Sequence, residues 1–144
     1  MKEKNKPHII GRNDIIDLPD LGLYDLPAKV DTGAYTSALS YKNWEIKDGE
    51  LHIVFEVEKG KTSTFKTREY YQKVIRNSFG QAEKRYIIKT TVKIFGDNYP
   101  TEFSLSKRKA LRFPVLLGRK FLKENFMVDV NRYKLSYKKK MRIS

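Results

Sequence analysis

The residues in this chain best suited to chemistry are Asp31, Thr32 and Gly33, which follow one another directly. A carboxylate can draw a proton from water and make that water a nucleophile for a peptide carbonyl. It needs a second carboxyl group about 3 Å away that shares one proton with it. The ionised group then acts as the base, and the protonated group donates to the developing oxyanion. We predict that Asp31 is such a carboxylate and that Thr32 and Gly33 form its catalytic loop.

The residues around Asp31 suit a tight loop that meets a second chain segment. The hydroxyl of Thr32 can hydrogen-bond across to an opposite loop, and Gly33 lets two backbones approach without a side chain between them. Ala34 is small enough to leave room for the backbone of a substrate. The alternative is an ordinary turn in which the Asp31 side chain bonds its own backbone, and the tripeptide alone does not exclude it.

A second motif lies far downstream, in residues 114–119, where an apolar run ends at Gly118. An apolar strand that ends in glycine can pass close to a catalytic loop, because glycine leaves space for the neighbouring backbone. We predict that this strand runs beside the Asp31 loop and that Gly118 and Arg119 contact the substrate. The alternative is a core strand that ends in glycine before a helix.

These runs together resemble the retropepsin-like proteins that are often called ATP-dependent zinc proteases. The resemblance implies a retropepsin-type β-barrel and a functional link to ATP-grasp ligases that attach glutamate to the tails of ribosomal proteins. One departure is Ser40, which stands where the family usually has histidine, so no role of that histidine carries over. Another is the run 76–80, which replaces a usual Arg-Ser-Ser-Gly sequence. The motifs that carry the resemblance are the runs 28–34, 36–39, 74–80, 84–88, 113–119 and 126–130.

The zinc in that family label finds no support in the residue types. The chain has no cysteine and two histidines, His8 and His52, and neither histidine belongs to a His-Glu-x-x-His run. A catalytic zinc ion usually needs three protein ligands. We therefore expect neither a metal site nor another cofactor.

The sequence Asp-Thr-Gly occurs once, so a second carboxylate must come from elsewhere. We expect a homodimer in which each subunit contributes Asp31 to a shared site on the two-fold axis. Asp129 is the other candidate partner, but we interpret it as a charge at a strand end that pairs with Arg119. A monomer with a single carboxylate would bind peptides without cutting them.

Residues 74–86 are expected to form a flap, a mobile hairpin that closes over the substrate and excludes water. Gly80 lies at the expected turn, and Arg76, Ser78, Gly80 and Arg85 are predicted to contact the substrate. Arginine matches carboxylates with two parallel hydrogen bonds, so the flap would favour an acidic peptide such as a glutamate tail. An ordinary solvated hairpin is the alternative.

Charge is distributed unevenly along the 144 residues, whose net charge is +13. Residues 1–60 hold 8 Lys/Arg and 11 Asp/Glu, a net charge of −3, whereas residues 61–144 hold 22 and 6, a net charge of +16. Such a basic half typically meets an acidic partner. Nucleic acid, with Tyr70, Tyr71 and Tyr86 as stacking residues, is the second choice after an acidic peptide or protein.

The length of the chain predicts one domain that spans residues 1–144, with flexible ends at 1–6 and 138–144. No apolar run approaches the roughly 20 residues of a membrane-spanning helix, and no apolar signal region follows the basic start. We therefore expect a cytoplasmic protein that does not enter a membrane.

Short strands separated by turns predict an all-β fold, either a closed barrel or a sandwich. Leu51, Ile53, Phe55 and Val57 alternate with other residues, which is the pattern of a half-buried strand with these four on one face. Of these, the family resemblance implies a retropepsin-like, acid-protease closed β-barrel, and we expect one short C-terminal helix in it. That helix is expected at residues 119–125, and the last strands at residues 126–130 and 133–137.

The predicted function is that of an aspartic endopeptidase, an enzyme that cleaves or trims peptide bonds with water activated by Asp31. Acidic or glutamate-extended protein tails are the expected substrates, and a glutamate ligase of the ATP-grasp type is an expected partner. The alternative is a non-catalytic basic β-barrel that binds an acidic peptide, a ligase partner or RNA.

Overall fold

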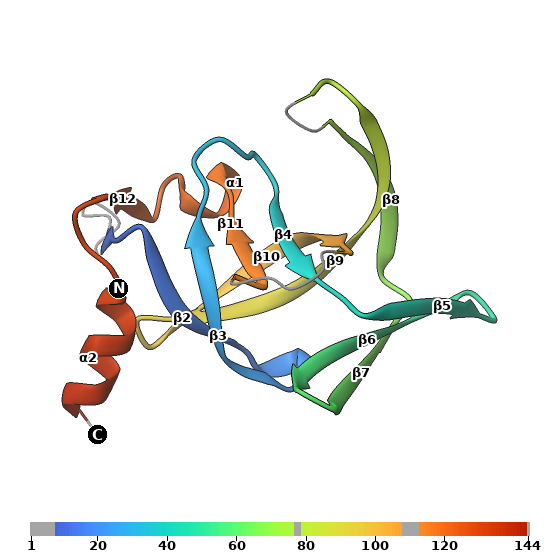
Figure 1. Cartoon of the computed structure of the whole chain (residues 1–144), viewed down its shortest axis with the longest axis horizontal. Coiled ribbons are helices and arrows are strands. Elements are labelled where there is room, and N and C mark those ends of the chain that lie inside the picture. The colour runs from blue at the N-terminus through green and yellow to red at the C-terminus, as the bar shows by residue number, and fades with distance from the viewer. Residues whose placement is uncertain (1–7, 77–78, 108–112, 144) are drawn as a thin grey trace.

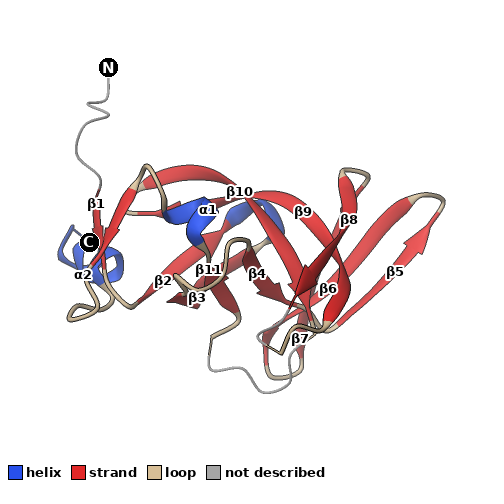
Figure 2. Cartoon of the chain, turned by 90° about the horizontal axis from the view of Figure 1, so that it is seen from above, coloured by secondary structure: helices blue, strands red, loops and turns tan. Residues whose placement is uncertain are grey.

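The structure is a computed structural model that describes residues 8–76, 79–107 and 113–143. Most of it is strand, as Figures 1 and 2 show. Its three helical segments are η1 (Pro19–Leu21, a 3-10 turn), α1 (Arg119–Leu122) and α2 (Leu135–Ile143). Its strands are β1 (His8–Ile10), β2 (Asn13–Leu18), β3 (Leu23–Val30), β4 (Ser37–Ser40), β5 (Asn43–Lys47), β6 (Glu50–Glu58), β7 (Lys61–Thr67), β8 (Tyr70–Arg76), β9 (Ala82–Ile94), β10 (Asp97–Ser106), β11 (Val115–Leu117) and β12 (Phe126–Val128).

Six strands form a closed barrel, which confirms the predicted all-β barrel fold. The strand order is β10-β4-β11-β3-β2-β9, and β9 pairs with β10 to close the sheet. Two of the pairings, β3 with β11 and β4 with β10, are parallel, so each joins segments that are distant in the sequence. Apolar side chains from every strand fill the interior, and Ile88, Phe103 and Leu117 are completely buried there. This burial supplies most of the driving force for closure.

A second sheet, β5-β6-β7, extends from the barrel as a pair of hairpins (Figure 2). Leu51, Ile53 and Phe55 of β6 are buried, as their alternation predicts, but Val57 is 40% exposed. The ladder between β6 and β7 shifts register between Glu56 and Glu58, and this irregularity follows the last buried residue of the face. The prediction that Val57 shares the buried face was therefore wrong. The outer strands β5 and β7 were not predicted, because both are polar and largely exposed.

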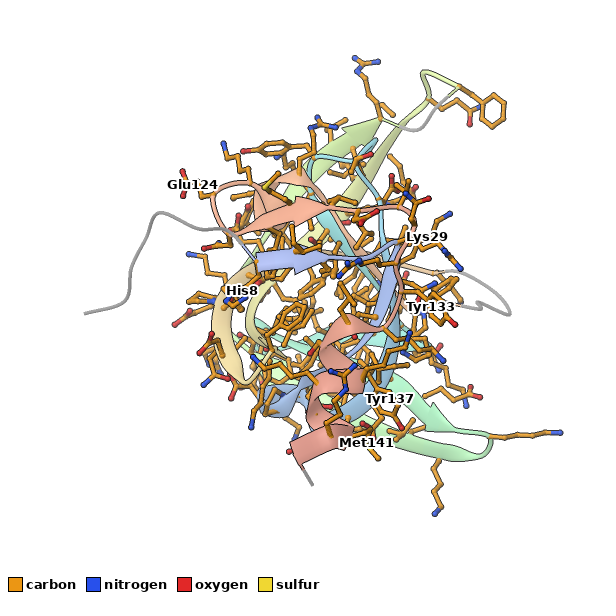
Figure 3. The ribbon with its side chains drawn as sticks, turned by 90° about the vertical axis from the view of Figure 1, so that its left-hand side faces the viewer. His8, Lys29, Glu124, Tyr133, Tyr137 and Met141 are labelled. Atoms are coloured by element: carbon orange, nitrogen blue, oxygen red, sulfur yellow. The ribbon has the colours of Figure 1, made fainter. Side chains whose placement is uncertain are left out.

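The C-terminal segment differs from its predicted structure. Residues 133–137 were expected to be a strand and residues 138–144 a flexible end, yet Leu135–Ile143 form the helix α2, which covers one end of the barrel (Figure 3). The chain thus has two C-terminal helices instead of one. Residues 1–6, the other predicted flexible end, lie outside the described residues.

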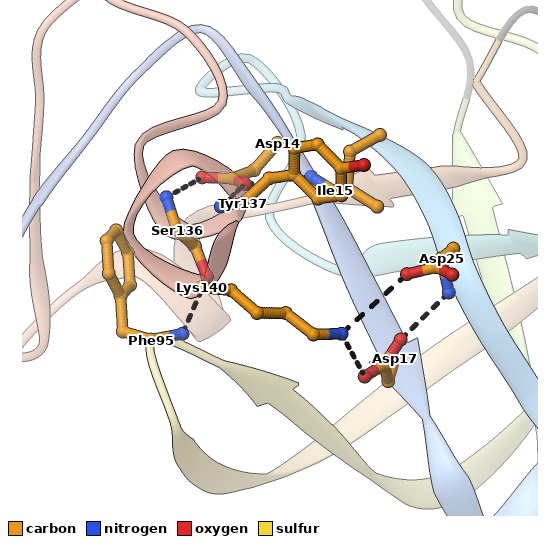
Figure 4. Close-up of polar contacts among 8 residues, drawn as sticks. All are labelled: Asp14, Ile15, Asp17, Asp25, Phe95, Ser136, Tyr137 and Lys140. Atoms are coloured by element: carbon orange, nitrogen blue, oxygen red, sulfur yellow. Dashed lines mark hydrogen bonds and ion pairs between the residues drawn. The ribbon is translucent and has the colours of Figure 1, made fainter. Parts of the chain in front are cut away.

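The start of α2 is fixed by a carboxylate from the opposite end of the sequence (Figure 4). Asp14 on β2 is 1% exposed and accepts hydrogen bonds from the N–H groups of Ser136 (2.9 Å) and Tyr137 (3.1 Å). The hydroxyl of Ser136 in turn accepts a hydrogen bond from the N–H of Phe95 (2.8 Å). An acidic group that satisfies the free N–H groups of a first helical turn stabilises that turn. This long-range cap explains why residues that look extended in the sequence are helical.

The first helix, α1, is shorter than predicted. It was expected to span residues 119–125 but ends at Leu122. Lys123 adopts an extended conformation, and Glu124 has a positive φ of 77°. Both conformations are incompatible with a continuing α-helix. The following strand, β12, pairs in parallel with β1 and ends at Val128, two residues before the predicted end.

Candidate active site

Asp31, Thr32 and Gly33 lie directly after β3, where the chain leaves the barrel. The N–H of Asp31 donates to the carbonyl oxygen of Leu117 on β11 (2.9 Å), so the loop starts from a fixed strand. The N–H of Gly33 donates to Oδ1 of Asp31 (3.1 Å) and thereby orients the carboxylate. Asp31 is half-buried, with Thr32 and Gly33 exposed beside it. The carboxylate therefore combines a defined direction with access to solvent.

The backbone of the Asp31 loop touches Gly118 so closely that no larger residue fits. A Cβ atom at Gly118 would lie 2.7 Å from the oxygen of Tyr35, 2.9 Å from the oxygen of Ala34 and 2.9 Å from the carbonyl carbon of Thr36. These distances are shorter than van der Waals contacts. An ordinary turn would form the same bond between Gly33 and Asp31, but it would not require this close approach.

Hydrogen bonds link the start of α1 to the loop that follows Asp31. Gly118 and the first two residues of α1 each direct a backbone N–H group at residues 34–37 of the loop. The two sequence motifs, 31–34 and 114–119, thus form one structural unit. The three bonds run from Gly118 N–H to Ser37 Oγ (3.0 Å), from Arg119 N–H to the oxygen of Ala34 (2.8 Å) and from Lys120 N–H to the oxygen of Tyr35 (2.9 Å).

The side chain of Arg119 braces the loop of Asp31, Thr32 and Gly33. Its guanidinium donates to the carbonyl oxygen of Thr32 (3.0 Å). The predicted pairing of Arg119 with Asp129 was wrong, because Asp129 instead pairs with Arg132 (3.5 Å), three residues further along the chain. Arg119 therefore contributes to the position of the loop through its backbone and through its side chain.

A cluster of cations surrounds Tyr35, next to the Asp31 loop. The charged groups of Lys73, Arg119 and Lys123 lie 5.9, 5.7 and 5.9 Å from the centre of the Tyr35 ring, which is 44% exposed. The negative face of an aromatic ring attracts cations at such distances. No local pattern in the sequence indicates this cluster, because its members come from three separate segments.

A groove of about 710 Å³ opens beside Asp31. One wall is formed by the Asp31 loop and β4, and the opposite wall by the hairpin of β8 and β9. Among the predicted site residues, Gly118 and Arg119 support the loop from behind and do not line this groove. The lining residues are Asp31, Gly33, Ala34, Tyr35, Thr36, Ala38, Lys73, Val74, Ile75, Arg76, Arg85, Ser104 and Leu116.

The hairpin formed by β8 and β9 occupies the position of the predicted flap and contributes two of the predicted arginines to the groove. Arg76 donates to the carbonyl oxygen of Gly80 (3.4 Å), near the turn of the hairpin. Arg85 pairs with Glu83 (3.1 Å). Gly80 does not line the groove, and Ser78 lies outside the described residues. This hairpin, called the flap below, thus lines the same groove as Asp31 and contributes cationic side chains to it.

Asp31 is the only carboxylate among the described residues that line the groove. The other charged groups of the lining, Lys73, Arg76 and Arg85, are cations. The groove of one chain therefore provides a single acid group and a positively charged wall. Chemistry that needs two carboxylates would need a second one from outside this lining.

A polar network that the sequence did not indicate links the flap to the barrel. Glu102 on β10 accepts hydrogen bonds from Lys120 on α1 and from the hydroxyl of Tyr71 on β8 (3.0 Å). The Lys120 hydrogen bond lowers the pKa of Glu102, and the same bond raises the pKa of Lys120. Desolvation and the hydrogen bond to Glu102 raise the pKa of Tyr71. The network fixes the base of the flap against α1, the helix that also contacts the Asp31 loop.

The histidines do not form a zinc site. His8 stacks on the ring of Phe95 with ring centres 5.4 Å apart, and the side chain of His52 forms a hydrogen bond with that of Glu50 (2.9 Å). The described residues contain no group of three or more His, Cys, Asp or Glu side chains that could hold a metal ion. The zinc of the family label therefore does not fit this part of the chain. None of the described helices is long and apolar enough to span a bilayer.

Known proteins share both the sequence and the shape of this chain. It is 34% identical over 128 residues to a probable alpha-L-glutamate ligase of Desulfotalea psychrophila, and 30% identical to one of Shewanella pealeana; both alignments cover 84% of this chain. The aligned part is 28% of the length of each ligase. A crystal structure of a Legionella pneumophila protein of unknown function has a TM-score of 0.76 and 25% identity, and it covers 91% of this chain and 99% of its own.

The sequence profile of a family of retropepsin-like aspartic endopeptidases matches residues 9–139, which include the Asp31 loop, the flap and Gly118. This match spans nearly all of the described structure, and it agrees with the closed barrel. The chain belongs to the RimB-like family, whose type is the retropepsin-like aspartic endopeptidase RimB.

Proposed function

We propose that this protein is an aspartic endopeptidase that acts as a homodimer, with Asp31 of each copy forming one catalytic pair. The observation that carries the proposal is the lone, oriented carboxylate of Asp31 at the wall of a groove of about 710 Å³. The groove is large enough for several residues of a peptide. Its single carboxylate is half of what the reaction needs, and a two-fold axis near the loop would supply the other half.

The chemistry follows from two like charges at short range. When two Asp31 carboxylates approach to about 3 Å, they cannot both ionise, so the pair holds one proton. The ionised group removes a proton from a water molecule, and the water attacks the peptide carbonyl. The protonated group donates to the carbonyl oxygen, and the tetrahedral intermediate then releases the amine. The hydrogen bond from the N–H of Gly33 and the packing of Gly118 against the loop would keep the position and orientation of each carboxylate constant during these steps.

The charges of the groove support an acidic substrate. Lys73 and Arg76 form no ion pair with a carboxylate of the described residues, whereas Arg85 is partly neutralised by Glu83. Cations in a groove attract carboxylates and raise the local concentration of an acidic peptide. The relatives named as glutamate ligases also point to glutamate chemistry. We therefore propose that the substrates are acidic or glutamate-extended protein tails and that a glutamate ligase is a functional partner.

The test is cleavage of glutamate-extended peptides by the wild-type protein and by Asp31→Asn from pH 4 to 8. Asparagine keeps the oxygen that accepts from the N–H of Gly33 but cannot act as the base, so cleavage should disappear without loss of the fold. Asp129→Asn is the matched control and should remain active. Cleavage by Asp31→Asn at the wild-type rate would refute the proposal.

Mixing the two proteins tests the dimer directly. If each active site needs Asp31 from both copies, a mixed dimer is inactive, and excess Asp31→Asn protein should reduce the activity of a fixed amount of wild type. Activity that stays proportional to the wild-type protein alone would show that one copy is sufficient.

A peptide-binding protein without catalysis is the second candidate function, and the single carboxylate in each groove is the observation that favours it. In that case wild type and Asp31→Asn would bind glutamate-extended peptides equally, and neither would cut them. Neutralising Lys73 and Arg76 would then weaken binding.

A further inference from the structure

A second basic surface lies at the start of α2, away from the residues that line the Asp31 groove. We call it the α2 surface and define it by Arg12, Lys29, Tyr133, Lys134 and Lys138, all of which are exposed. Figure 3 shows Lys29 and Tyr133 along one side of the molecule, continuous with the helix. None of the five belongs to the residues that line the groove.

Backbone contacts bring these residues together from three distant segments. Lys29 on β3 lies opposite Asn13 in the ladder with β2. The oxygen of Asn13 accepts a hydrogen bond from the N–H of Lys134 (2.8 Å), and the N–H of Arg12 donates to the oxygen of Arg132 (2.8 Å). The sequence alone could not indicate this surface, since its parts become neighbours only when the C-terminal segment packs on the first strands.

The ring of Tyr133 contacts two cations. The guanidinium of Arg12 lies 4.9 Å, and the ammonium of Lys138 3.9 Å, from the ring centre. None of the four cations of the surface forms an ion pair with a carboxylate of the described residues. The surface therefore presents several cations whose charge a bound anion can neutralise.

The neighbouring residue Lys140 has a different role. It pairs with Asp17 (3.6 Å) and Asp25 (3.8 Å) on the barrel, as Figure 4 shows. Together with the cap from Asp14, these pairs fix the helix before any ligand arrives. A rigid backbone lowers the conformational entropy that the surface loses on binding.

We propose that the α2 surface binds the phosphate backbone of a nucleic acid. Nucleic acids carry one charge per phosphate at regular short spacing, and they bind exposed lysine and arginine side chains without needing a groove. The hydroxyl of an exposed tyrosine is a further common donor to phosphate. A membrane is disfavoured, because Met141 is the only apolar side chain among the described exposed residues of α2.

The test measures binding of fluorescein-labelled single-stranded RNA, and of DNA of the same sequence, by fluorescence anisotropy. The variant Lys29→Gln/Lys138→Gln removes two cations of the surface, and glutamine is compatible with a strand and a helix. The matched control is Lys59→Gln/Lys66→Gln, which removes two exposed lysines from the hairpin of β6 and β7. Circular dichroism verifies that both variants are folded.

The surface variant should bind RNA roughly tenfold more weakly, and the slope of log affinity against log salt should fall by about one to two, since two phosphate contacts are lost. The control should stay within about twofold of wild type. Equal affinity for RNA and DNA would support backbone recognition, and tighter binding of RNA would add a contact to its 2′-hydroxyl groups. Equal losses in both variants, or no loss in either, would overturn the proposal.

Two further ligands complete the test. The first is polyglutamate, added at a concentration of negative charges equal to that of the RNA. If it displaces the RNA, and if its binding is weakened by Lys29→Gln/Lys138→Gln as that of RNA is, the proposal is overturned in favour of an acidic protein. Binding to phosphatidylserine vesicles that is weakened by the same two substitutions would overturn the proposal in favour of a membrane. The peptidase proposal is independent: Asp31→Asn should bind RNA like wild type, whether or not the wild type cleaves peptides.

Discussion

Gly118 provides the sharpest test of how the Asp31 loop is held. Its φ of −91° and ψ of 178° are open to any residue, so alanine would be tolerated if conformation alone mattered. Alanine would even gain about 0.4–1 kcal/mol from the lower entropy of the unfolded chain. The structure opposes this gain, because the new Cβ would lie 2.7 Å from the oxygen of Tyr35 and 2.9 Å from that of Ala34. The loop and the start of α1 must therefore separate.

The cost of Gly118→Ala combines overpacking with weakened hydrogen bonds. Overpacking costs about 1–3 kcal/mol, and each of the three loop-to-helix bonds contributes about 1 kcal/mol when it is intact. Since the bonds would stretch without all being lost, we expect a decrease of about 2–4 kcal/mol in the free energy of unfolding. Any peptidase activity should fall more strongly than stability does, because the Asp31 loop moves with its support.

Urea denaturation followed by far-ultraviolet circular dichroism measures this change across the barrel. Trp44, the single tryptophan, lies on β5 and contacts Tyr86, so its fluorescence reports on the outer sheet instead. The control is Gly60→Ala, where φ is +84° and no atom lies within 4 Å of a new Cβ. It should cost about 1–2 kcal/mol through backbone strain alone. A Gly118→Ala protein as stable as wild type, or a larger loss at Gly60, would refute the reasoning.

Two further predictions concern residues outside the groove. Asp14→Ala should lower the free energy of unfolding by about 2–3 kcal/mol and weaken α2 first, because the N–H groups of Ser136 and Tyr137 in its first turn lose their acceptor. Hydrogen exchange that is no faster in α2 than in the barrel would contradict this. Glu102→Gln should cost less than about 1 kcal/mol at pH 7, because Lys120 is half exposed. The pKa of Glu102 is lowered from 4.5. The wild type should therefore exceed Glu102→Gln in free energy of unfolding by the full difference above that pH, and the difference should vanish as the pH falls through the lowered pKa. Urea titrations at several pH values would measure this difference in stability, and a difference that does not change with pH would contradict the prediction.

Local features, whose signals lie in neighbouring residues, could be predicted from the sequence. The alternation of Leu51, Ile53 and Phe55 predicted a half-buried strand, because strand side chains alternate between two faces. The run of apolar residues before Gly118 predicted a strand, and the short strands with turns predicted a barrel or a sandwich, of which the family resemblance implied the barrel. The motifs, in their order along the chain, also indicated the family, and the match to the RimB-like profile confirmed it.

Features that depend on partners far away in the chain became visible only in the folded molecule. Residues 135–143 are helical because Asp14, distant in the sequence, caps them, and no window around α2 contains that information. The polar strands β5, β7 and β8 form because neighbouring strands satisfy their backbone groups, not because their own side chains are buried. The cations around Tyr35 and Tyr133 likewise converge from separate segments. The local sequence pattern thus determines which residues can be buried, whereas the packing of distant segments determines which charged side chains come into contact.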